Sequence, residues 1–92
     1  MANVERRIMA IKRKTYPCVP GETSMTAPEL AYIPVLHMVA LNGKVHRIIT
    51  SDDDMVLTGL QVRHSPSFGA LFFNELIPFE SGNSINVVYE TV

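Results

Sequence analysis

The chain has 92 residues, of which 47% are hydrophobic and 18% are charged, and its net charge is −1. This length and composition fit one small domain with a single core and exclude an intrinsically disordered chain. No apolar run reaches the roughly 18 residues that span a bilayer, and the single Cys18 excludes an internal disulfide. We therefore expect a protein that is held together by packing and needs no membrane.

The charge is distributed unevenly along the chain. Residues 1–14 carry one acidic side chain and five basic ones, namely Arg6, Arg7, Lys12, Arg13 and Lys14. Residues 15–92 carry three basic and eight acidic side chains. Such asymmetry indicates a basic segment that contacts nucleic acid or an acidic neighbour. We divide the chain into a basic N-terminal arm or edge strand, residues 1–14, and a domain, residues 15–92.

The first third of the chain contains weak strand signals separated by prolines. Residues 6–16 are expected to be an extended arm or edge strand, with a helical turn as the alternative. Prolines at 17 and 20 end any helix, because proline lacks the amide donor and restricts the preceding residue. Thr23–Thr26 is a short predicted strand. Residues 27–34 contain a proline near each end, Pro28 and Pro34, and are predicted to be a loop or one turn of helix.

The strongest structural signal is a hairpin in the middle of the chain. Val35–Leu41 is an apolar run of strand length, Asn42-Gly43 follows it, and Lys44–Thr50 is again strand-like. An Asn-Gly pair between two such runs predicts a type I′ turn, in which both central residues have positive φ. The apolar run is typical of a strand covered on both faces or lying in a subunit contact.

The remaining chain continues the alternation of strands and turns. An acidic loop at Asp52–Asp54 precedes Thr58–His64, where Leu60 and Val62 are predicted to face one side and Gln61 and Arg63 the other. Two further strands are predicted at residues 70–74 and 84–91. About seven short strands with regularly spaced turns predict an all-β protein, a small antiparallel β-sandwich.

Several motifs occur in a recognisable order: Gly21, Thr23, Pro28, Asn42-Gly43, Gly69-x-Leu71-x-Phe73, Phe79-Glu80-Ser81-Gly82 and Ile85-x-Val87-x-Tyr89. In this order they resemble a small Ig-like β-sandwich repeat of tailed-bacteriophage virion proteins, found in tail-fibre, neck or ring, and head-associated proteins. The resemblance covers about residues 15–92 and implies a virion structural part without catalytic residues. Met25 stands where the repeat prefers an aromatic residue, and the basic preface favours a stand-alone, self-assembling subunit.

Candidate sites for chemistry are weak throughout the sequence. Asp52–Asp54 could contribute oxygen ligands to Ca²⁺, but adjacent side chains diverge and no bidentate Glu follows at loop spacing. His37, His46 and His64 lack the paired spacing of zinc ligands, and Cys18 lacks the base and the orienting group that a nucleophile needs. We therefore expect no catalytic residue, no metal site, no cofactor and no enzymatic activity.

The basic residues are more informative as an interface. Nucleic-acid readers of this charge usually add stacking aromatics or a recognition helix, whereas here only Tyr16 is near and the rest of the chain is acidic. Nucleic-acid binding is therefore the less favoured alternative for this segment. We expect Arg6, Arg7, Lys12, Arg13 and Lys14 to form a subunit interface with an acidic neighbour.

Apolar residues exceed what one small core needs in two places. These are Val35–Leu41 and a cluster formed by Phe72, Phe73, Leu76, Ile77 and Phe79. Either part of this surface faces a partner or the core is simply well filled.

Together these features predict a non-enzymatic virion protein, an oligomeric ring or connector subunit of the neck or tail region. Its partners would be copies of itself and other virion structural proteins. The alternatives are a capsid decoration or head-fibre protein and a carbohydrate-binding adhesin. Sugar sites usually stack an aromatic face on the ligand, and this chain has no Trp and three Tyr.

Overall fold

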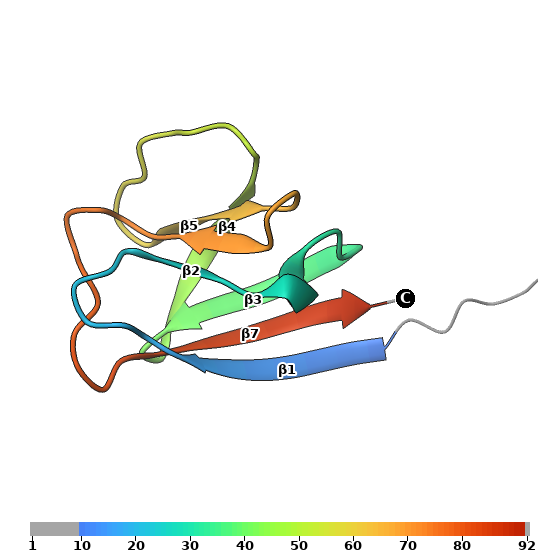
Figure 1. Ribbon diagram of the computed structural model, residues 1–92, viewed down its shortest axis with the longest axis horizontal. Helices are drawn as coiled ribbons and strands as arrows, with labels where there is room; N and C mark the ends of the chain where they lie inside the picture. The colour runs from blue at the N-terminus through green and yellow to red at the C-terminus, as the bar shows by residue number, and fades with distance from the viewer. Residues whose placement is uncertain (1–9, 92) are drawn as a thin grey trace, which may run out of the picture.

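The computed structural model describes residues 10–91, which form seven strands and one short 3₁₀ helix (Figure 1). The all-β class and the number of strands are confirmed. The elements in chain order are β1 (Ala10–Pro17), β2 (Ser24–Thr26), η1 (Pro28–Leu30), β3 (Val35–Leu41), β4 (Lys44–Thr50), β5 (Gln61–Ser65), β6 (Ala70–Phe72) and β7 (Ser84–Thr91).

The strands form one curled sheet in the order β1-β7-β3-β4-β5-β6-β2. Strand β4 joins the two halves of this sheet, because its first residues pair with β3 and residues 47–50 pair with β5. In Figure 1, β1, β7 and β3 form one layer, and β4 leads from it to β5. The core lies inside the curl.

The expectation of a purely antiparallel arrangement is wrong at one pair. Strands β4 and β5 run parallel, with Arg47 opposite Gln61 and Thr50 opposite His64. A parallel pair requires a crossover connection rather than a tight turn, and residues 51–60 provide it. The sheet is therefore mixed, and an Ig-like sandwich of two separate sheets stays a prediction.

The Asn42-Gly43 hairpin is confirmed. Leu41 pairs with Lys44 across the turn, and Asn42 and Gly43 have φ values of 49° and 82°. Positive φ at both positions is the signature of the type I′ turn that the two residue types predict. The turn fixes the register of β3 and β4.

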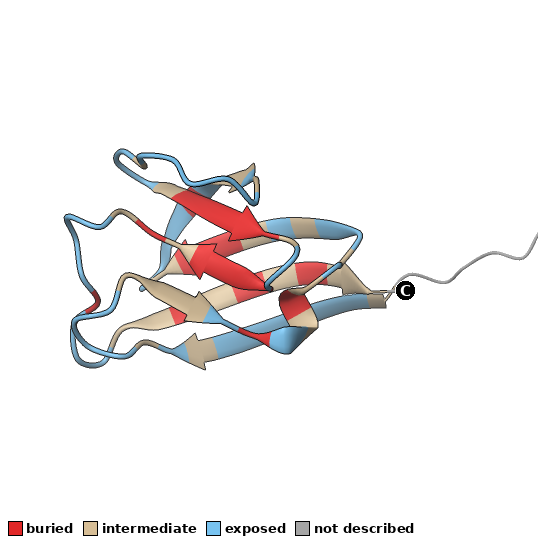
Figure 2. Cartoon of the chain, turned by 45° about the horizontal axis from the view of Figure 1, so that its top comes forward, coloured by how far each residue is buried: buried red, intermediate tan, exposed pale blue. Residues whose placement is uncertain are grey.

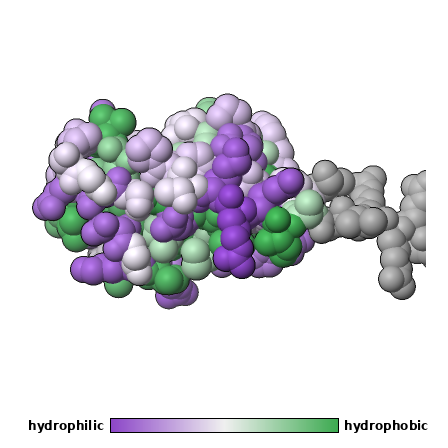
Figure 3. All heavy atoms as spheres, turned by 90° about the horizontal axis from the view of Figure 1, so that it is seen from below, coloured by the Kyte–Doolittle hydropathy of each residue, from purple (hydrophilic) through white to green (hydrophobic). Residues whose placement is uncertain are grey.

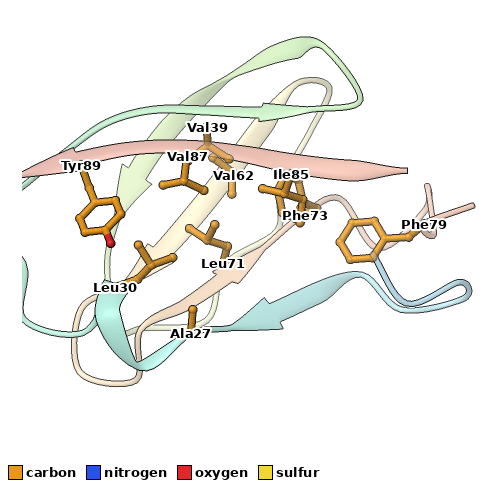
Figure 4. Close-up of a cluster of buried hydrophobic side chains, with 10 residues drawn as sticks. All are labelled: Ala27, Leu30, Val39, Val62, Leu71, Phe73, Phe79, Ile85, Val87 and Tyr89. Carbon is orange, nitrogen blue, oxygen red and sulfur yellow. The ribbon is translucent and has the colours of Figure 1, made fainter. Parts of the chain in front are cut away.

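Strand β7 provides much of the core because its side chains alternate between the two faces of the sheet. Ile85, Val87 and Tyr89 are at most 2% exposed. Figure 4 shows them grouped with Leu71 of β6 and Leu30 of η1, and Figure 2 shows the same pattern as buried segments on facing strands. Burying each large side chain of this kind contributes about 1.5–3 kcal/mol.

Residues 27–34, predicted to be a loop or one turn of helix, contain the short 3₁₀ helix η1, which inserts Leu30 into the core at 0% exposure. The amide of Ala27 donates to the carbonyl of Gly69 at 2.9 Å. The ring nitrogen Nε2 of His64 lies 2.8 Å from the carbonyl oxygen of Leu30, which can only accept, so the imidazole donates. These bonds hold η1 against the turn between β5 and β6.

Candidate subunit interface

Strand β1 forms an open border of the sheet. Among residues 10–91 it pairs only with β7, across its full length from Ala10 opposite Thr91 to Pro17 opposite Ser84. Five consecutive residues, Ile11–Thr15, are exposed. Figure 3 looks onto the side that carries β1 and shows a band of hydrophilic side chains across it. An edge strand of this length presents backbone groups that another chain can pair with.

The basic residues of β1 are divided between the two faces of the sheet. Lys12 and Lys14 pair with Tyr89 and Val87, whose side chains face the core, so they lie on that side. Arg13 pairs with Val88 and lies on the outer side. The positive charge therefore surrounds the strand edge instead of covering one face.

The core-facing side of β1 is fastened to η1. The hydroxyl of Tyr16 donates to Glu29 Oε1 at 2.6 Å, and Lys14 Nζ lies 4.0 Å from the same oxygen. Burial, reinforced by Glu29, raises the pKa of Tyr16 above its usual value. The hydrogen bond from Tyr16 lowers the pKa of Glu29.

The structure thus places three of the five predicted interface residues, Lys12, Arg13 and Lys14, on one exposed strand. Arg6 and Arg7 lie outside the described residues. Strand β1 runs across the boundary predicted between residues 14 and 15, so residues 10–14 belong to the sheet. Their role as an interface stays a prediction.

A second feature, which sequence reasoning did not identify, is a groove of about 610 Å³. It lies between the loop of residues 51–60 and the residues that follow β6, and we call it the loop groove. Its apolar lining includes Met55, Val56, Leu57, Phe72, Phe73 and Leu76. Val56 and Leu76 are 88% and 89% exposed. Two loops therefore present apolar side chains to solvent around one depression.

Arg63 fixes one wall of the loop groove. Its Nη1 donates to the carbonyl of Ser51 at 3.0 Å, its Nη2 donates to Asp54 Oδ1 at 3.2 Å, and its guanidinium lies 4.0 Å from the centre of the Phe72 ring. Alternation predicted Arg63 on the face opposite Val62, and it proves to be buried, at 5% exposure. The loop of residues 51–60 lies over this second face of β5.

Asp52 fastens the same loop at its start. Its carboxylate accepts from the hydroxyls of Ser65 and Ser67, both at 2.6 Å, and from the Ser67 amide at 3.1 Å. These bonds, the one from Ser65 first, lower the pKa of Asp52. The three consecutive aspartates therefore diverge, since Asp52 bonds to serines and Asp54 to Arg63. Within the described range, no group of three or more His, Cys, Asp and Glu side chains is placed to hold a metal ion.

The histidines lie at separate places in the fold. His37 Nε2 is 2.6 Å from Glu90 Oε1, and His46 Nδ1 is 2.8 Å from the Lys44 carbonyl oxygen, with its ring edge-on to Phe73. Residue 46 pairs with Val39, so His37 and His46 are not cross-strand partners. Cys18 is half-buried, and this burial raises the pKa of its thiol.

The apolar cluster predicted at residues 72–79 divides into two groups. Phe73 and Phe79 are buried and meet edge to face, with ring centres 5.4 Å apart. Leu76 and Ile77 are exposed. Ile77 and Leu60 line a smaller hollow of about 220 Å³. Phe73 lines both this hollow and the loop groove. Core filling and surface exposure therefore both occur in this segment.

Comparison of this chain with protein-family models, with curated proteins and with solved structures finds no match. In the part of the chain that the structure describes, no helix is long and apolar enough to cross a membrane.

Proposed function

We propose that this chain is a non-enzymatic structural subunit of a tailed-bacteriophage virion, an oligomeric ring or connector component of the neck or tail. The observation that carries the proposal is the eight-residue open edge of β1, which is lined by three exposed cations. The motif order from Gly21 to Tyr89 and the exposed apolar loops support it. Its localisation would be the assembled virion, with copies of itself and other virion proteins as partners.

The charges on β1 determine which kind of contact its edge favours. In a two-fold antiparallel pairing of β1 with a second β1 centred on Arg13, Arg13 would face its own copy and Lys12 would face Lys14. Like charges directly opposite each other destabilise a strand pair, and lysines on edge strands oppose self-pairing. The edge of β1 therefore favours contact with a different, acidic surface of a neighbouring subunit over pairing with a second β1.

A contact is heterologous when two identical subunits meet through different surfaces. Such contacts close into a ring when the rotation between subunits fits, and they continue as a filament otherwise. The surplus of acidic residues in positions 15–92 provides the complementary charge. A ring or connector is therefore favoured over an isologous dimer, and a capsid decoration or head-fibre role remains the related alternative.

The experiment is native mass spectrometry and electron microscopy of the purified protein at low and high salt. We expect a discrete oligomer that dissociates as salt rises, because salt screens exposed charges. Lys12→Glu with Arg13→Glu should dissociate it at low salt. Lys44→Glu with Arg47→Glu, which reverses two exposed cations on β4, should not. A monomer at every salt concentration, or equal effects of the two double variants, would contradict the proposal.

One observation favours a second candidate function, that of a carbohydrate-binding adhesin. Tyr32 and Phe68 are 78% and 67% exposed, and the Tyr32 amide donates to the Pro66 carbonyl at 3.0 Å, which holds their loops side by side. Exposed aromatic faces are what sugar rings stack on. Glycan-array binding that is lost in Tyr32→Ala and in Phe68→Ala would support this function, and an array without signal would exclude it.

A further inference from the structure

We propose that residues 1–9 of one subunit bind in the loop groove of the next subunit. This inference rests on the proposed oligomeric function and identifies the acceptor surface for the basic segment. The one occupant to which we commit is therefore the sequence Met1-Ala2-Asn3-Val4-Glu5-Arg6-Arg7-Ile8-Met9 of a second copy.

The loop groove combines an apolar floor with acidic side chains at its border. Phe72 and Phe73 contribute to the lining, and the exposed Val56 and Leu76 extend it outward. Asp54 and Glu75 also line it, and both are exposed. Among the described residues of the lining, the one cation is Arg63, which already bonds to Asp54. A complementary ligand would bring apolar side chains for the floor and positive charge for the border, where Glu75 has no bond to a cation of the described lining.

Residues 1–9 have this composition. Val4, Ile8 and Met9 are apolar, and Arg6 and Arg7 outnumber the one acidic residue, Glu5. Arginine is well suited to carboxylates because its planar guanidinium can bond both oxygens. Nine extended residues reach about 30 Å, so the segment is long enough to leave its own subunit. The charge and the apolar content of residues 1–9 therefore both match the loop groove.

The arrangement of the strands favours binding to a second copy. Residues 1–9 precede Ala10, which pairs with Thr91 at one end of β1, whereas Pro17 pairs with Ser84 at the other end. The residues after β6 lie beyond the Pro17 end, since the amides of Phe73 and Phe79 donate to the carbonyls of Thr23 and Glu22. Figure 1 shows the same separation, with the segment that follows β6 at one end of the molecule and the start of β1 at the other.

This separation has a consequence for assembly. The eight residues of β1 extend for about 25 Å between the two ends. A segment that leaves one end and binds near the opposite end of the next copy makes a head-to-tail contact, which is the heterologous type expected for a ring.

The test uses charge exchange, with the oligomeric state measured by native mass spectrometry and analytical ultracentrifugation. Arg6→Glu with Arg7→Glu should weaken self-association by about tenfold or more, and so should Glu75→Arg, because each places like charges together. Combining the three substitutions should restore association. The matched control is Glu22→Arg, an exposed acidic residue outside the groove lining. No weakening by the first two variants, or weakening without restoration, would overturn the inference.

A peptide experiment separates this inference from the proposed function. A synthetic peptide of residues 1–9 should bind the variant that lacks residues 2–9, and Val56→Ser with Leu76→Ser should abolish the binding, whereas Val19→Ser, at another exposed valine, should not. If the shortened variant stays fully oligomeric and does not bind the peptide, this inference fails while the oligomeric function stands. If deletion lowers the melting temperature of a monomer, the segment binds its own subunit and the inference is wrong.

Discussion

The hydroxyl of Tyr16 donates a 2.6 Å hydrogen bond to Glu29, and this bond links the edge strand β1 to the helix η1. Among residues 10–91, strand β1 pairs only with β7, and on its core-facing side Tyr16 packs against the core and bonds to η1. The bond therefore couples the open border, on which the proposed assembly depends, to the packing of Leu30 in the core.

Tyr16→Phe should lower the free energy of unfolding by about 1 kcal/mol, the usual net value of one hydrogen bond. The loss should depend on pH. Because the pKa of Tyr16 is raised in the folded protein, its contribution is fully present below about pH 10, the usual tyrosine value, and is lost as the pH rises further. Denaturant unfolding of both proteins at pH 7 and pH 11 measures this. A difference that persists undiminished at pH 11 would contradict the assignment.

Asp52 should make the attachment of the loop at residues 51–60 sensitive to acid. Its pKa is lowered by the bonds from Ser65 and Ser67, so its contribution is present above the unfolded value, near pH 4, and is lost as the pH falls through the lower folded value. Hydrogen exchange at the Ser67 amide, which donates to Asp52, should accelerate relative to its intrinsic rate over that range. Asp52→Ala should show fast exchange already at pH 7, whereas Asp53→Ala should not.

The sequence was most informative where local chemistry determines the backbone. Only residues that tolerate positive φ fit a type I′ turn, so Asn42-Gly43 identified the hairpin. The strict alternation of Ile85, Val87 and Tyr89 identified the buried face of β7. Both signals depend on neighbouring residues alone, so they can be read without knowledge of the rest of the fold.

The parts that could not be predicted depend on contacts between distant residues. Whether β5 runs parallel or antiparallel to β4 is decided by the path of residues 51–60, and no residue type within that loop determines the path. The burial of Arg63 has the same origin, since Asp54 and the Ser51 carbonyl reach it only after the loop has folded over β5. The loop groove is a product of this path and was therefore missed, although the surplus of apolar residues near Leu76 indicated an exposed surface.

Gly69→Ala should be among the most damaging single substitutions in the domain. A Cβ atom at Gly69 would lie 2.4 Å from the Ala27 carbonyl oxygen and 2.8 Å from the Ala31 amide nitrogen. Overpacking of about 1–3 kcal/mol adds to the left-handed backbone cost of about 1–2 kcal/mol, because φ is +63°. Gly82→Ala is the matched control, since φ is +85° there and nothing lies within 4 Å of the added atom. If thermal unfolding shows that the two variants lose equal stability, the close approach of Gly69 to η1 does not matter for the fold.

Substitutions of two leucines five residues apart, Leu71 and Leu76, should distinguish effects on folding from effects on assembly. Leu71 is fully buried, so Leu71→Ala should cost about 2–5 kcal/mol through lost burial and the remaining cavity. Leu76 is 89% exposed, so Leu76→Ala should change the unfolding free energy by less than about 0.5 kcal/mol. If Leu76 contacts a neighbouring subunit, its loss should instead shift the monomer–oligomer equilibrium, measured by sedimentation at several concentrations. A large loss of stability with unchanged association would mean that Leu76 supports the fold of its own subunit, and the loop groove would then lack the exposed apolar wall that binding of residues 1–9 requires.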